Sequence, residues 1–470
     1  MTDLSCDVVV IGAGTAGLAA ERSARRNGAK TLLVDEQFSG TTCASVGCMP
    51  SKLLIAAADA AHAVRRAGIF GVEAAAPVVN GAAVMARVQR ERDAYVAGAK
   101  ASIADLPEGI AVKARARFVE RTKLALDDGR HVTARAVVIA TGATASVPAA
   151  FDAVRAHVLT NESIFELRDL PRSVGVIGAG PIGLELAQAL ARLGVDTHVF
   201  EQSESVAALV DAPVASALRT ILARELPITL GVEVSAELDG QGVLVRWKGK
   251  ESGERHFDRL LVAAGRAPNL KGLDLAKTGI ALDEHGTPRF DASTRQCDGS
   301  AIFIAGDADH DRPVLHEASS EGTLAGRNAA TFPAVTPEAR AVPLSVMFTD
   351  PPVAVIGTVP AKGDTHVLGV ASYEDQGRAK VYARNAGLAH LYAERDGGRL
   401  VGATMTGPGV EHSAHLLAWA IQLGLTASEV LDLPFYHPTF EEGLKPALRS
   451  ICKEANAPFP FRENGFVAGA

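Results

Sequence analysis

The stretch that decides the fold runs from Asp7 to Asp35 and reads DVVVIGAGTAGLAAERSARRNGAKTLLVD. It begins with an uninterrupted apolar run, which is typical of a strand buried on both faces of a parallel sheet. Glycines in the spacing GxGxxG follow, then a helical stretch that ends at Gly28, and then a second apolar run that ends on Asp35. This order predicts a complete strand–helix–strand unit with a glycine turn after its first strand.

The same unit recurs between Ser173 and Glu201, at a constant offset of 166 residues. One register aligns the turn, the end of the helix and the terminal acid without a gap, so the match is not a chance one. The matching pairs are Gly12 with Gly178, Gly17 with Gly183, Gly28 with Gly194 and Asp35 with Glu201.

Both glycine turns predict dinucleotide sites. GxGxxG alone is weak evidence, but each motif here follows a buried strand, opens a helix and precedes an acid by 18 residues. The glycines let the backbone approach a pyrophosphate at the positive end of the helix, while the acid accepts a hydrogen bond from an adenosine ribose. Two sites predict two different dinucleotides, and glycines that serve only packing are the alternative. The motifs contain Gly12, Gly14 and Gly17 in the first turn and Gly178, Gly180 and Gly183 in the second.

Glu201 bears on the choice between NAD and NADP. Its carboxylate would repel a 2′-phosphate, and no arginine follows it in residues 202–206. The second site is therefore expected to prefer NAD. The alternative is an ordinary solvated carboxylate at the end of a strand.

Three later apolar runs, at residues 136–142, 260–265 and 301–305, indicate the domain organisation. The first two complete the two units, and the third comes after the second unit, so we expect the chain to return to the first domain. The pattern predicts an α/β fold in which one dinucleotide-binding domain carries another as an insertion, followed by an α+β domain. The predicted domains are residues 1–147 with 267–340, residues 148–266 and residues 341–470.

Some elements outside the two units can also be predicted. Alternating segments predict strands in the terminal domain, and helices should begin there at Glu411 and Thr439. The alanine-rich segment 55–67 has helical spacing and is expected to be a packed helix. The predicted terminal strands are 353–356, 379–384 and 389–394.

Composition excludes several classes of protein. The 47 Lys and Arg residues against 54 Asp and Glu give a formal charge of −7, which disfavours a general electrostatic grip on nucleic acid or anionic lipid. The sequence contains no run of 18 apolar residues, so no membrane span is predicted, and residues 1–6 lack the features of a secretory signal. The sequence therefore predicts a cytoplasmic protein with neither nucleic acid nor membrane as a partner.

Two of the five cysteines, Cys43 and Cys48, lie close together after the first unit. A pair at this spacing, with one member at the start of a helix, can close a small reducible disulfide, and a helix N-terminus lowers the pKa of a thiol. Zinc is disfavoured because four residues separate the two cysteines and no second pair of ligands follows, so no metal site is predicted. Two packed, reduced thiols are the alternative.

A cycling disulfide needs a base, and His437 is the candidate because Glu442, five residues later, can orient its imidazole. The alternative is structural, since Thr439 and Glu442 also fit a capping box for the following helix.

Together these motifs resemble those of the group I pyridine nucleotide-disulfide oxidoreductases, the family of dihydrolipoamide dehydrogenase, glutathione reductase and mercuric reductase. The resemblance spans nearly the whole chain. It implies two Rossmann-like domains, an FAD domain with an inserted NAD domain, and a C-terminal α+β dimerisation domain. The further motifs that carry it are Pro50-Ser51-Lys52, Ala140-Thr141-Gly142, the second fingerprint up to Glu185, Gly265-Arg266-Ala267-Pro268-Asn269, Gly306-Asp307 and His437-Pro438-Thr439.

The resemblance implies FAD in the first site and NAD in the second. Lys52 would lie near N5 of the flavin, and Asp307 would bind the ribityl chain. The implied FAD residues are Gly12, Gly14, Gly17, Asp35, Thr42, Lys52, Ala116, Thr141, Gly142 and Asp307, and the implied NAD residues are Gly178, Gly180, Gly183, Glu185, Glu201, Val234 and Gly265.

The resemblance also implies a division of labour at the thiols. Cys48 would make the charge-transfer contact with the flavin, Cys43 would exchange with the substrate, and His437 with Glu442 would come from the partner subunit of an obligate homodimer. The base would deprotonate a dithiol, and the reduced cysteine pair would pass two electrons to FAD and then to NAD.

Within the family, the sequence favours a dihydrolipoamide substrate. Residues 466–470 contain no cysteine pair of the mercuric reductase type, and the missing arginines after Glu201 disfavour glutathione reductase. The substrate would be a small or protein-bound dithiol, with lipoylated subunits of a 2-oxo acid dehydrogenase-type complex as candidate partners. Phe435, Thr41 and Pro352 depart from the usual pattern. They leave the substrate open, so a reductase of another small disulfide, a quinone or a metal ion is an alternative. A flavoprotein redox sensor or assembly subunit without turnover is a separate, non-enzymatic alternative.

Overall fold

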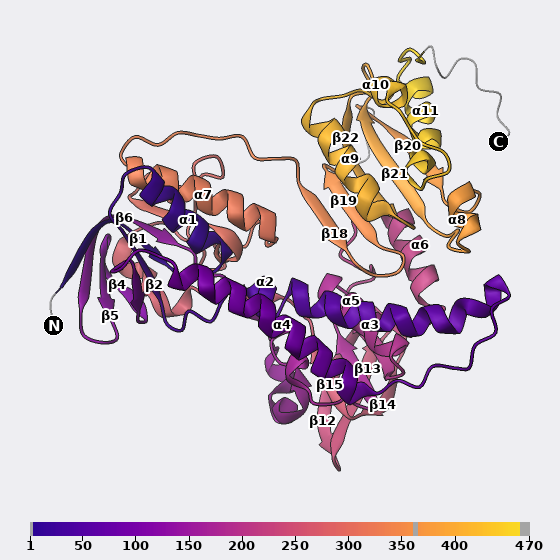
Figure 1. Ribbon diagram of the computed structural model, residues 1–470, viewed down its shortest axis with the longest axis horizontal. Helices are drawn as coiled ribbons and strands as arrows, with labels where there is room; N and C mark the ends of the chain where they lie inside the picture. Colours follow the sequence, from indigo (N-terminus) through magenta and orange to yellow (C-terminus); the bar gives the residue numbers. More distant parts are fainter. Residues whose placement is uncertain (1–2, 361–364, 461–470) are drawn as a thin grey trace.

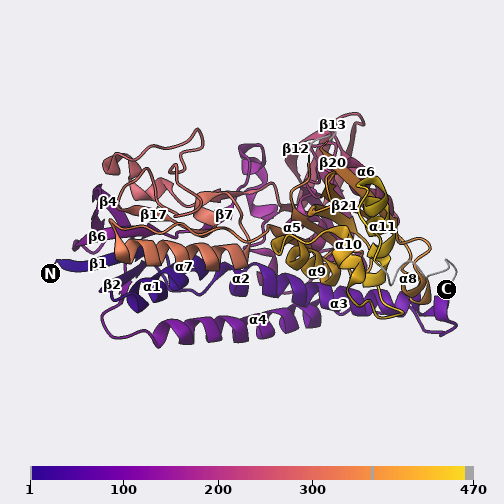
Figure 2. The same cartoon turned by 90° about the horizontal axis from the view of Figure 1, so that it is seen from above.

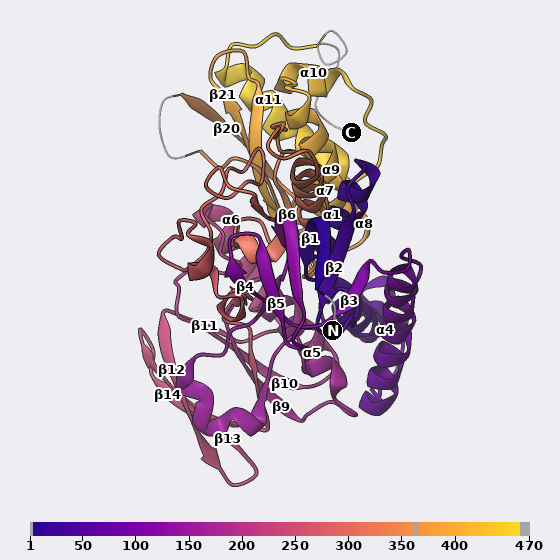
Figure 3. The ribbon, with the colours of Figure 1, turned by 90° about the vertical axis from the view of Figure 1, so that its left-hand side faces the viewer.

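The computed structural model describes residues 3–360 and 365–460, and within them the first sheet has seven strands. Their order is β3-β2-β1-β6-β5-β4, with β17 next to β6. Strand β1 pairs in parallel with β2 and β6, and Figure 3 shows the three side by side. The strands are β1 Leu4–Ile11, β2 Thr31–Asp35, β3 Ala111–Lys113, β4 Ala116–Glu120, β5 Lys123–Leu126, β6 His131–Ile139 and β17 Ile302–Ile304.

Strand β17 follows the second sheet in the sequence, yet it pairs in parallel with β6, with Ile302 opposite Val137. The chain therefore returns to the first sheet after it has built the second one, as the apolar run at 301–305 predicts. The boundaries drawn from the sequence, near residues 147, 266 and 340, stay predictions.

Two helices cover one face of the first sheet, α1 (Thr15–Arg26) and α7 (Leu315–Thr331), which lie side by side in Figure 2. Their backbones touch, because a Cβ placed on Gly322 would lie 2.2 Å from the carbonyl oxygen of Ala16. Only a residue without a side chain allows this approach, so α7 packs closely on the helix that follows the first glycine turn.

The second sheet, in the order β11-β10-β9-β15-β8, contains the repeated unit β9–α5–β10. Three antiparallel strands, β12-β13-β14, lie next to it, and β16 pairs with β7. The elements are β7 Ala143–Ala145, β8 Val158–Leu159, β9 Ser173–Ile177, α5 Pro181–Arg192, β10 Asp196–Glu201, α6 Ala212–Leu222, β11 Ile228–Leu230, β12 Val232–Asp239, β13 Gly242–Gly249, β14 Gly253–Phe257, β15 Arg259–Val262 and β16 Arg266–Pro268.

The C-terminal domain is an antiparallel sheet, β18-β19-β22-β21-β20, with helices packed on it. Figure 1 shows it at the upper right, above the second sheet, with the first sheet at the left. Its elements are β18 Leu344–Met347, β19 Val353–Gly357, β20 His366–Ser372, α8 Gly377–Val381, β21 Leu388–Glu394, β22 Leu400–Thr406, α9 Val410–Gln422, α10 Ala427–Asp432 and α11 Lys445–Glu454.

Two expectations for this domain are wrong. Residues 379–384 form no strand, because the side chain of Gln376 accepts a hydrogen bond from the amide of Ala379 (2.7 Å) and starts the short helix α8 there. The helix expected from Thr439 begins as a 3₁₀ turn at Glu441 and becomes α11 only at Lys445. The strands expected at 353–356 and 389–394 and the helix expected from Glu411 are confirmed as β19, β21 and α9.

A helical pair joins the first sheet to the other two domains. Helix α3 (Cys48–Arg66) includes all but the last residue of the helix expected at 55–67. Helix α4 (Gly81–Ala104) runs beside α3 in Figure 2. Leu54 of α3 and Met85 of α4 share a core with α5. The remaining short elements are α2 Thr42–Ser45, η1 Ala67–Phe70, η2 Ala149–His157, η3 Ile164–Glu166, η4 Lys271–Leu273, η5 Leu275–Thr278, η6 Gly306–Asp309 and η7 Glu441–Leu444.

A buried polar contact ties the second unit to the C-terminal domain. The Asp211 carboxylate caps α6 through the amide of Val214, and its Oδ2 lies 2.7 Å from Nδ1 of His390 and accepts a hydrogen bond from the hydroxyl of Tyr392.

Among residues 3–360 and 365–460, no helix has the length and apolarity needed to cross a membrane.

Candidate active site

The first glycine turn has two closed positions and one open one. A Cβ on Gly12 would lie 2.4 Å from the carbonyl oxygen of Ala140, and one on Gly17 would lie 1.8 Å from that of Gly12. A Cβ on Gly14 would meet nothing within 4 Å. Gly12 and Gly17 are therefore required by backbone packing, whereas Gly14 faces open space, where a pyrophosphate can approach the start of α1.

The second glycine turn repeats this arrangement. A Cβ on Gly178 would lie 2.5 Å from the carbonyl oxygen of Ala263, and one on Gly183 would lie 2.0 Å from that of Gly178. Gly180 is open, with nothing within 4 Å. Packing and ligand approach are thus divided among the glycines in the same way in both units.

The acids that end β2 and β10 also serve the turns themselves. Asp35 accepts a hydrogen bond from the amide of Ala13 (2.9 Å), and Glu201 accepts one from the amide of Ala179 (2.7 Å). Glu201 further accepts from the amide of Ser203 (2.8 Å). Glu201 is therefore more than a solvated carboxylate at the end of a strand, because it holds the turn beside which a ribose would lie.

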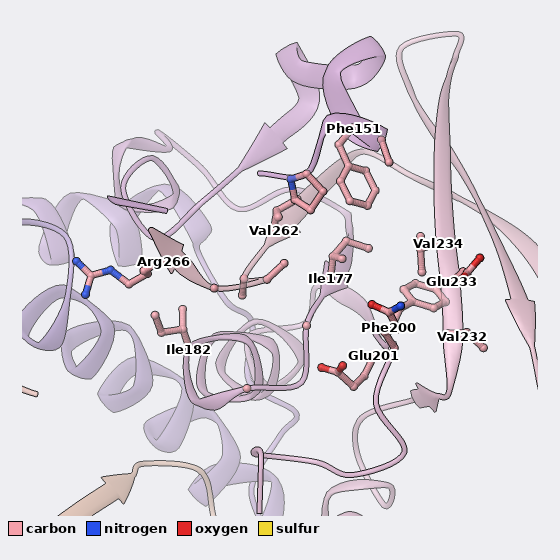
Figure 4. Close-up of a pocket in the computed structure, with 18 of the residues that line it drawn as sticks. Phe151, Ile177, Ile182, Phe200, Glu201, Val232, Glu233, Val234, Val262 and Arg266 are labelled. Carbon is pink, nitrogen blue, oxygen red and sulfur yellow. The ribbon is translucent and has the colours of Figure 1, made fainter. Parts of the chain in front are cut away.

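A cavity of about 660 Å³ opens at the second turn. In Figure 4, Arg266 and Val234 lie at opposite ends of it, and Glu201 lies between them. Five of the residues expected to bind NAD line it: Gly178, Gly180, Glu201, Val234 and Gly265. Gly183 is packed behind the turn, and Glu185 lines the neighbouring cavity instead.

The neighbouring cavity, of about 320 Å³, contains both thiols. Of the residues expected to bind FAD, those that line it are Gly14, Thr42, Lys52, Gly142 and Asp307. Gly12, Gly17, Asp35, Ala116 and Thr141 do not, and the side chain of Ala116 is buried in the core of the first sheet. Their roles toward FAD stay predictions.

The two cavities adjoin, because Asn161, Pro181, Ile182 and Arg266 line both of them. The Arg266 guanidinium forms an ion pair with Asp307 and donates to the carbonyl oxygen of Ala143 (2.6 Å). Sequence reasoning assigned no role to any of these four residues, although Arg266 belongs to one of the motifs that carry the resemblance. The junction is the place where groups held in the two cavities can meet.

Lys52 lies at the meeting point of all three domains. Its ammonium donates to Oε2 of Glu185 (2.7 Å) and lies 4.5 Å from the centroid of the Phe348 ring. The amide of Phe348 donates to Oε1 of the same glutamate (2.8 Å). Glu185 therefore fixes Lys52 beside the thiols, and sequence reasoning missed Phe348 because no motif includes it.

The two cysteines differ in their environments. Cys43 lies in the short helix α2, while Cys48 is the first residue of α3, so its sulfur is next to a helix N-terminus. A hydrogen bond from the Cys43 thiol, helped by the Lys52 ammonium, lowers the pKa of Cys48 to about 6, although burial opposes this shift. The same contact raises the pKa of Cys43. Cys48 is thus the better thiolate of the pair.

The expected base lies away from the thiols of its own subunit. Nδ1 of His437 is 3.0 Å from Oε2 of Glu442, and Glu442 also accepts from the amide of Thr439 (3.2 Å). Glu442 therefore contacts both the imidazole and the turn before α11, but among the described residues it makes only one of the two hydrogen bonds of a capping box with Thr439. The catalytic role of the pair stays a prediction. The His437 side chain is 67% exposed, and none of the residues 435–442 lines either cavity.

The thiol cavity fits a polar cofactor. Arg266 lines this cavity, and its buried Nε lacks a hydrogen-bond partner among the described residues. Buried polar atoms normally have partners, and Gly14, which is open, lines the same cavity. In the part of the chain that the structure describes, no cluster of three or more His, Cys, Asp or Glu side chains could hold a metal ion.

Two family models match the chain: "Pyridine nucleotide-disulphide oxidoreductase" over residues 6–322, and the dimerisation domain of the same family over residues 343–448. The chain belongs to this family of flavoprotein disulfide oxidoreductases. Members use FAD and NAD(P), and the dimerisation domain supports a homodimer. The resemblance seen in the sequence, the fold and the two cofactors are thereby confirmed.

Relatives with different substrates are similarly close. A dihydrolipoyl dehydrogenase of Haloferax volcanii is 31% identical over 469 residues, covering 96% of this chain and 97% of its own. A mercuric reductase of Streptomyces lividans is 30% identical over 466 residues, covering 95% and 96%. Among solved structures, the HOCl-induced flavoprotein disulfide reductase RclA from Escherichia coli has a TM-score of 0.81 at 21% identity, covering 94% of this chain and 99% of that one.

Proposed function

We propose that the protein oxidises dihydrolipoamide and reduces NAD, through the pair Cys43–Cys48. The observation that carries the proposal is the thiol pair, in which the pKa of Cys48 is lowered, beside Lys52 in a cavity that adjoins the second dinucleotide cavity. Similarity to dihydrolipoyl dehydrogenases over nearly the whole chain supports the choice of substrate.

The first step would be thiol–disulfide exchange. His437 of the partner subunit, oriented by its own glutamate, takes the proton of one substrate thiol. The resulting thiolate attacks the sulfur of Cys43, the Cys43–Cys48 bond breaks, and Cys48 leaves as a thiolate. Its lowered pKa and the Lys52 ammonium support this leaving role.

The second step releases the product. The other substrate thiol attacks the substrate sulfur bound to Cys43, the bond from that sulfur to Cys43 breaks, and the cyclic disulfide forms. The raised pKa of Cys43 favours its leaving with the proton that the histidine holds, and the histidine then takes the proton of the second substrate thiol. FAD held in the thiol cavity would supply a two-electron acceptor for the reduced pair, and NAD held at the second turn would supply the final hydride acceptor. Lys52, held by Glu185, would keep a positive charge next to the thiolate.

Glu201 supports NAD rather than NADP at the second site. Its carboxylate lines the cavity and is held by two backbone amides, so a 2′-phosphate there would meet a fixed negative charge. A cytoplasmic location, and lipoylated subunits of a 2-oxo acid dehydrogenase-type complex as partners, stay predictions.

The main alternative is reduction of another small disulfide, a quinone or a metal ion with NAD(P)H. It is favoured by the mercuric reductases among the relatives and by the fold shared with RclA, which has been solved as a Cu(II) complex. Residues 466–470, where the sequence lacks a second cysteine pair, lie outside the described residues. A redox sensor or assembly subunit without turnover is the non-enzymatic alternative.

A substrate panel separates these functions. The purified FAD-loaded protein is assayed without oxygen for NADH formation from NAD and dihydrolipoamide, and for NADH or NADPH oxidation by glutathione disulfide, a quinone, Hg(II) and Cu(II). The proposal expects dihydrolipoamide turnover of about 10 per second or more and little activity with the other compounds. Faster turnover of any of them would contradict the proposed substrate, and no turnover at all would favour a sensor.

A further inference from the structure

Behind the thiol cavity lies a cluster of buried charges that the proposed chemistry does not use. Arg295 is 0% exposed, Glu321 3% and Asp309 5%. Burying charges is costly unless they are paired, and the cluster is paired throughout, since Arg295 forms ion pairs with both Asp309 and Glu321. The cluster contacts the turn η6 (Gly306–Asp309) at both ends, and the second residue of this turn, Asp307, lines the cavity.

Asp309 is the last residue of the turn, and Glu321 is the member that contacts the turn from another element. Its Oε2 accepts a hydrogen bond from the amide of Gly306 (2.9 Å). Its Oε1 accepts one from Arg340 (2.6 Å) and lies 3.3 Å from Nη1 of Arg295. Glu321 on α7 is therefore the link between the buried charges and the backbone that presents Asp307.

The turn needs such a link because glycine does not fix its own conformation. Gly306 has φ +70°, and a Cβ there would lie 2.8 Å from Cβ of Ala16, so a side chain is excluded at this position. A glycine peptide is free to adopt many other conformations when nothing holds it. The carboxylate of Glu321 supplies the constraint that a side chain on residue 306 cannot.

We propose that Glu321 is a positioning residue for FAD. Its side chain holds the Gly306–Asp307 turn in the conformation that receives the cofactor. Arg340, from the segment that leads to the C-terminal domain, and Arg295 hold the carboxylate in place. The inference rests on the assignment of this cavity to FAD and does not depend on the substrate.

Glutamine is a close substitute for this carboxyl group. Burial, and then the Asp309 carboxylate, raises the pKa of Glu321 to about 7, so a neutral side chain is tolerated at this place. The amide oxygen of Glu321→Gln can still accept from Gly306, whereas Glu321→Ala removes the acceptor.

Glu317 offers a matched control. It lies one helical turn earlier on α7, is 5% exposed, and accepts from Arg312 (2.9 Å) and Arg340 (3.2 Å). Among the described residues it makes no hydrogen bond to the turn 306–309, so it shares the burial and Arg340 with Glu321 but not the contact with Gly306.

The test is the rate at which FAD leaves the loaded protein on dilution, followed by the rise in flavin fluorescence. We expect Glu321→Ala to release FAD about 10- to 100-fold faster, which is the value of one hydrogen bond to an ionisable group. Glu321→Gln and Glu317→Ala should stay within about 3-fold of the parent protein. Equal rates for Glu321→Ala and Glu317→Ala, or no rescue by glutamine, would overturn the proposal.

A second pair of variants keeps the test decisive if Glu321→Ala does not fold. Arg340 contacts Glu321, whereas Arg327 pairs with Glu338 of the same connecting segment. Arg340→Met should release FAD faster than Arg327→Met, and equal rates would contradict the proposal. Because the readout is FAD release, a failure here is distinct from a failure to turn over dihydrolipoamide.

Discussion

The two strand–helix–strand units have the same turn but different helix surfaces. Their glycines are closed or open at the same places, and Asp35 and Glu201 hold the turns through equivalent amides. At the same offset of 166 residues, however, Glu185 replaces Ala19 and Ile182 replaces Ala16. The repeated motif thus predicts where a dinucleotide binds in each unit, while Ile182 within the motif and Glu185 after it distinguish the second helix from the first.

The helices of the two units also have different partners. Helix α1 packs against α7 through glycines that let the backbones touch. Helix α5 instead presents Glu185, Gln188 and Arg192 to the segment 348–350, where Gln188 accepts from the amide of Asp350 (2.7 Å) and Arg192 pairs with its carboxylate (2.9 Å). The first unit is closed by apolar packing, while the second joins three domains by polar contacts.

The largest expected effect concerns the thiols, which line the cavity at the first glycine turn and not the cavity at the second. Cys43→Ser should lower dihydrolipoamide turnover by about 1000-fold or more, since the exchanging sulfur is gone, while bound FAD is kept. Turnover and the flavin absorbance spectrum are the measurements. Cys6→Ser, in β1, is the control and should remain active; full activity of Cys43→Ser would end the relay mechanism.

The next effect compares equivalent alanine substitutions in the two glycine turns. Gly17→Ala would place a methyl 1.8 Å from a carbonyl oxygen, and Gly183→Ala would do so at 2.0 Å, so each should distort its own turn at a cost of about 3 kcal/mol. We expect Gly17→Ala to lose FAD, and Gly183→Ala to keep FAD but weaken NAD binding at least 10-fold. Fluorescence of released FAD and a titration with NAD measure both. Loss of FAD from Gly183→Ala would show that the units are not independent.

A titration sharpens the role of Glu185 and Lys52. In the dithiol form, Cys48 should be a thiolate above pH about 6 and protonated below it. Lys52→Met removes a nearby positive charge, so the midpoint should rise by about one pH unit. The ultraviolet absorbance of the thiolate follows this step, with the exposed Lys100→Met as control. An unchanged midpoint would show that Lys52 does not act on the thiol.

The smallest expected effect concerns the second acid. Glu201→Ala removes the fixed charge next to the ribose, so the preference for NADH over NADPH in kcat/KM should fall by about 10-fold or less. Glu201→Gln keeps an acceptor for the turn and separates the loss of charge from the loss of structure. Equal kcat/KM for the two nucleotides in the parent protein would refute the expected NAD preference.

Much of this architecture is readable in the sequence because it depends on local patterns. The glycine spacing, the apolar runs and the terminal acids Asp35 and Glu201 follow from backbone geometry that any such unit must satisfy. The contact between His437 and Glu442 is also predictable, since Glu442 follows His437 by five residues in the same turn.

The rest depends on contacts between distant segments. Ile182, Arg266 and Phe348 become neighbours of the thiol cavity or of Lys52 only when three domains come together, and no local pattern indicates this. Residues 379–384 alternate as a strand would, but the side chain of Gln376 caps a helix there instead.

The central claim is that the base of one subunit serves the thiols of the other. Cys43→Ser and His437→Ala subunits, each inactive alone, are co-expressed with different tags, and the mixed dimer is isolated and assayed with the best substrate of the panel. One of its two sites would contain both defects and the other neither, so we predict about half of the parent turnover per dimer. A mixed dimer as inactive as its parents would contradict the shared site.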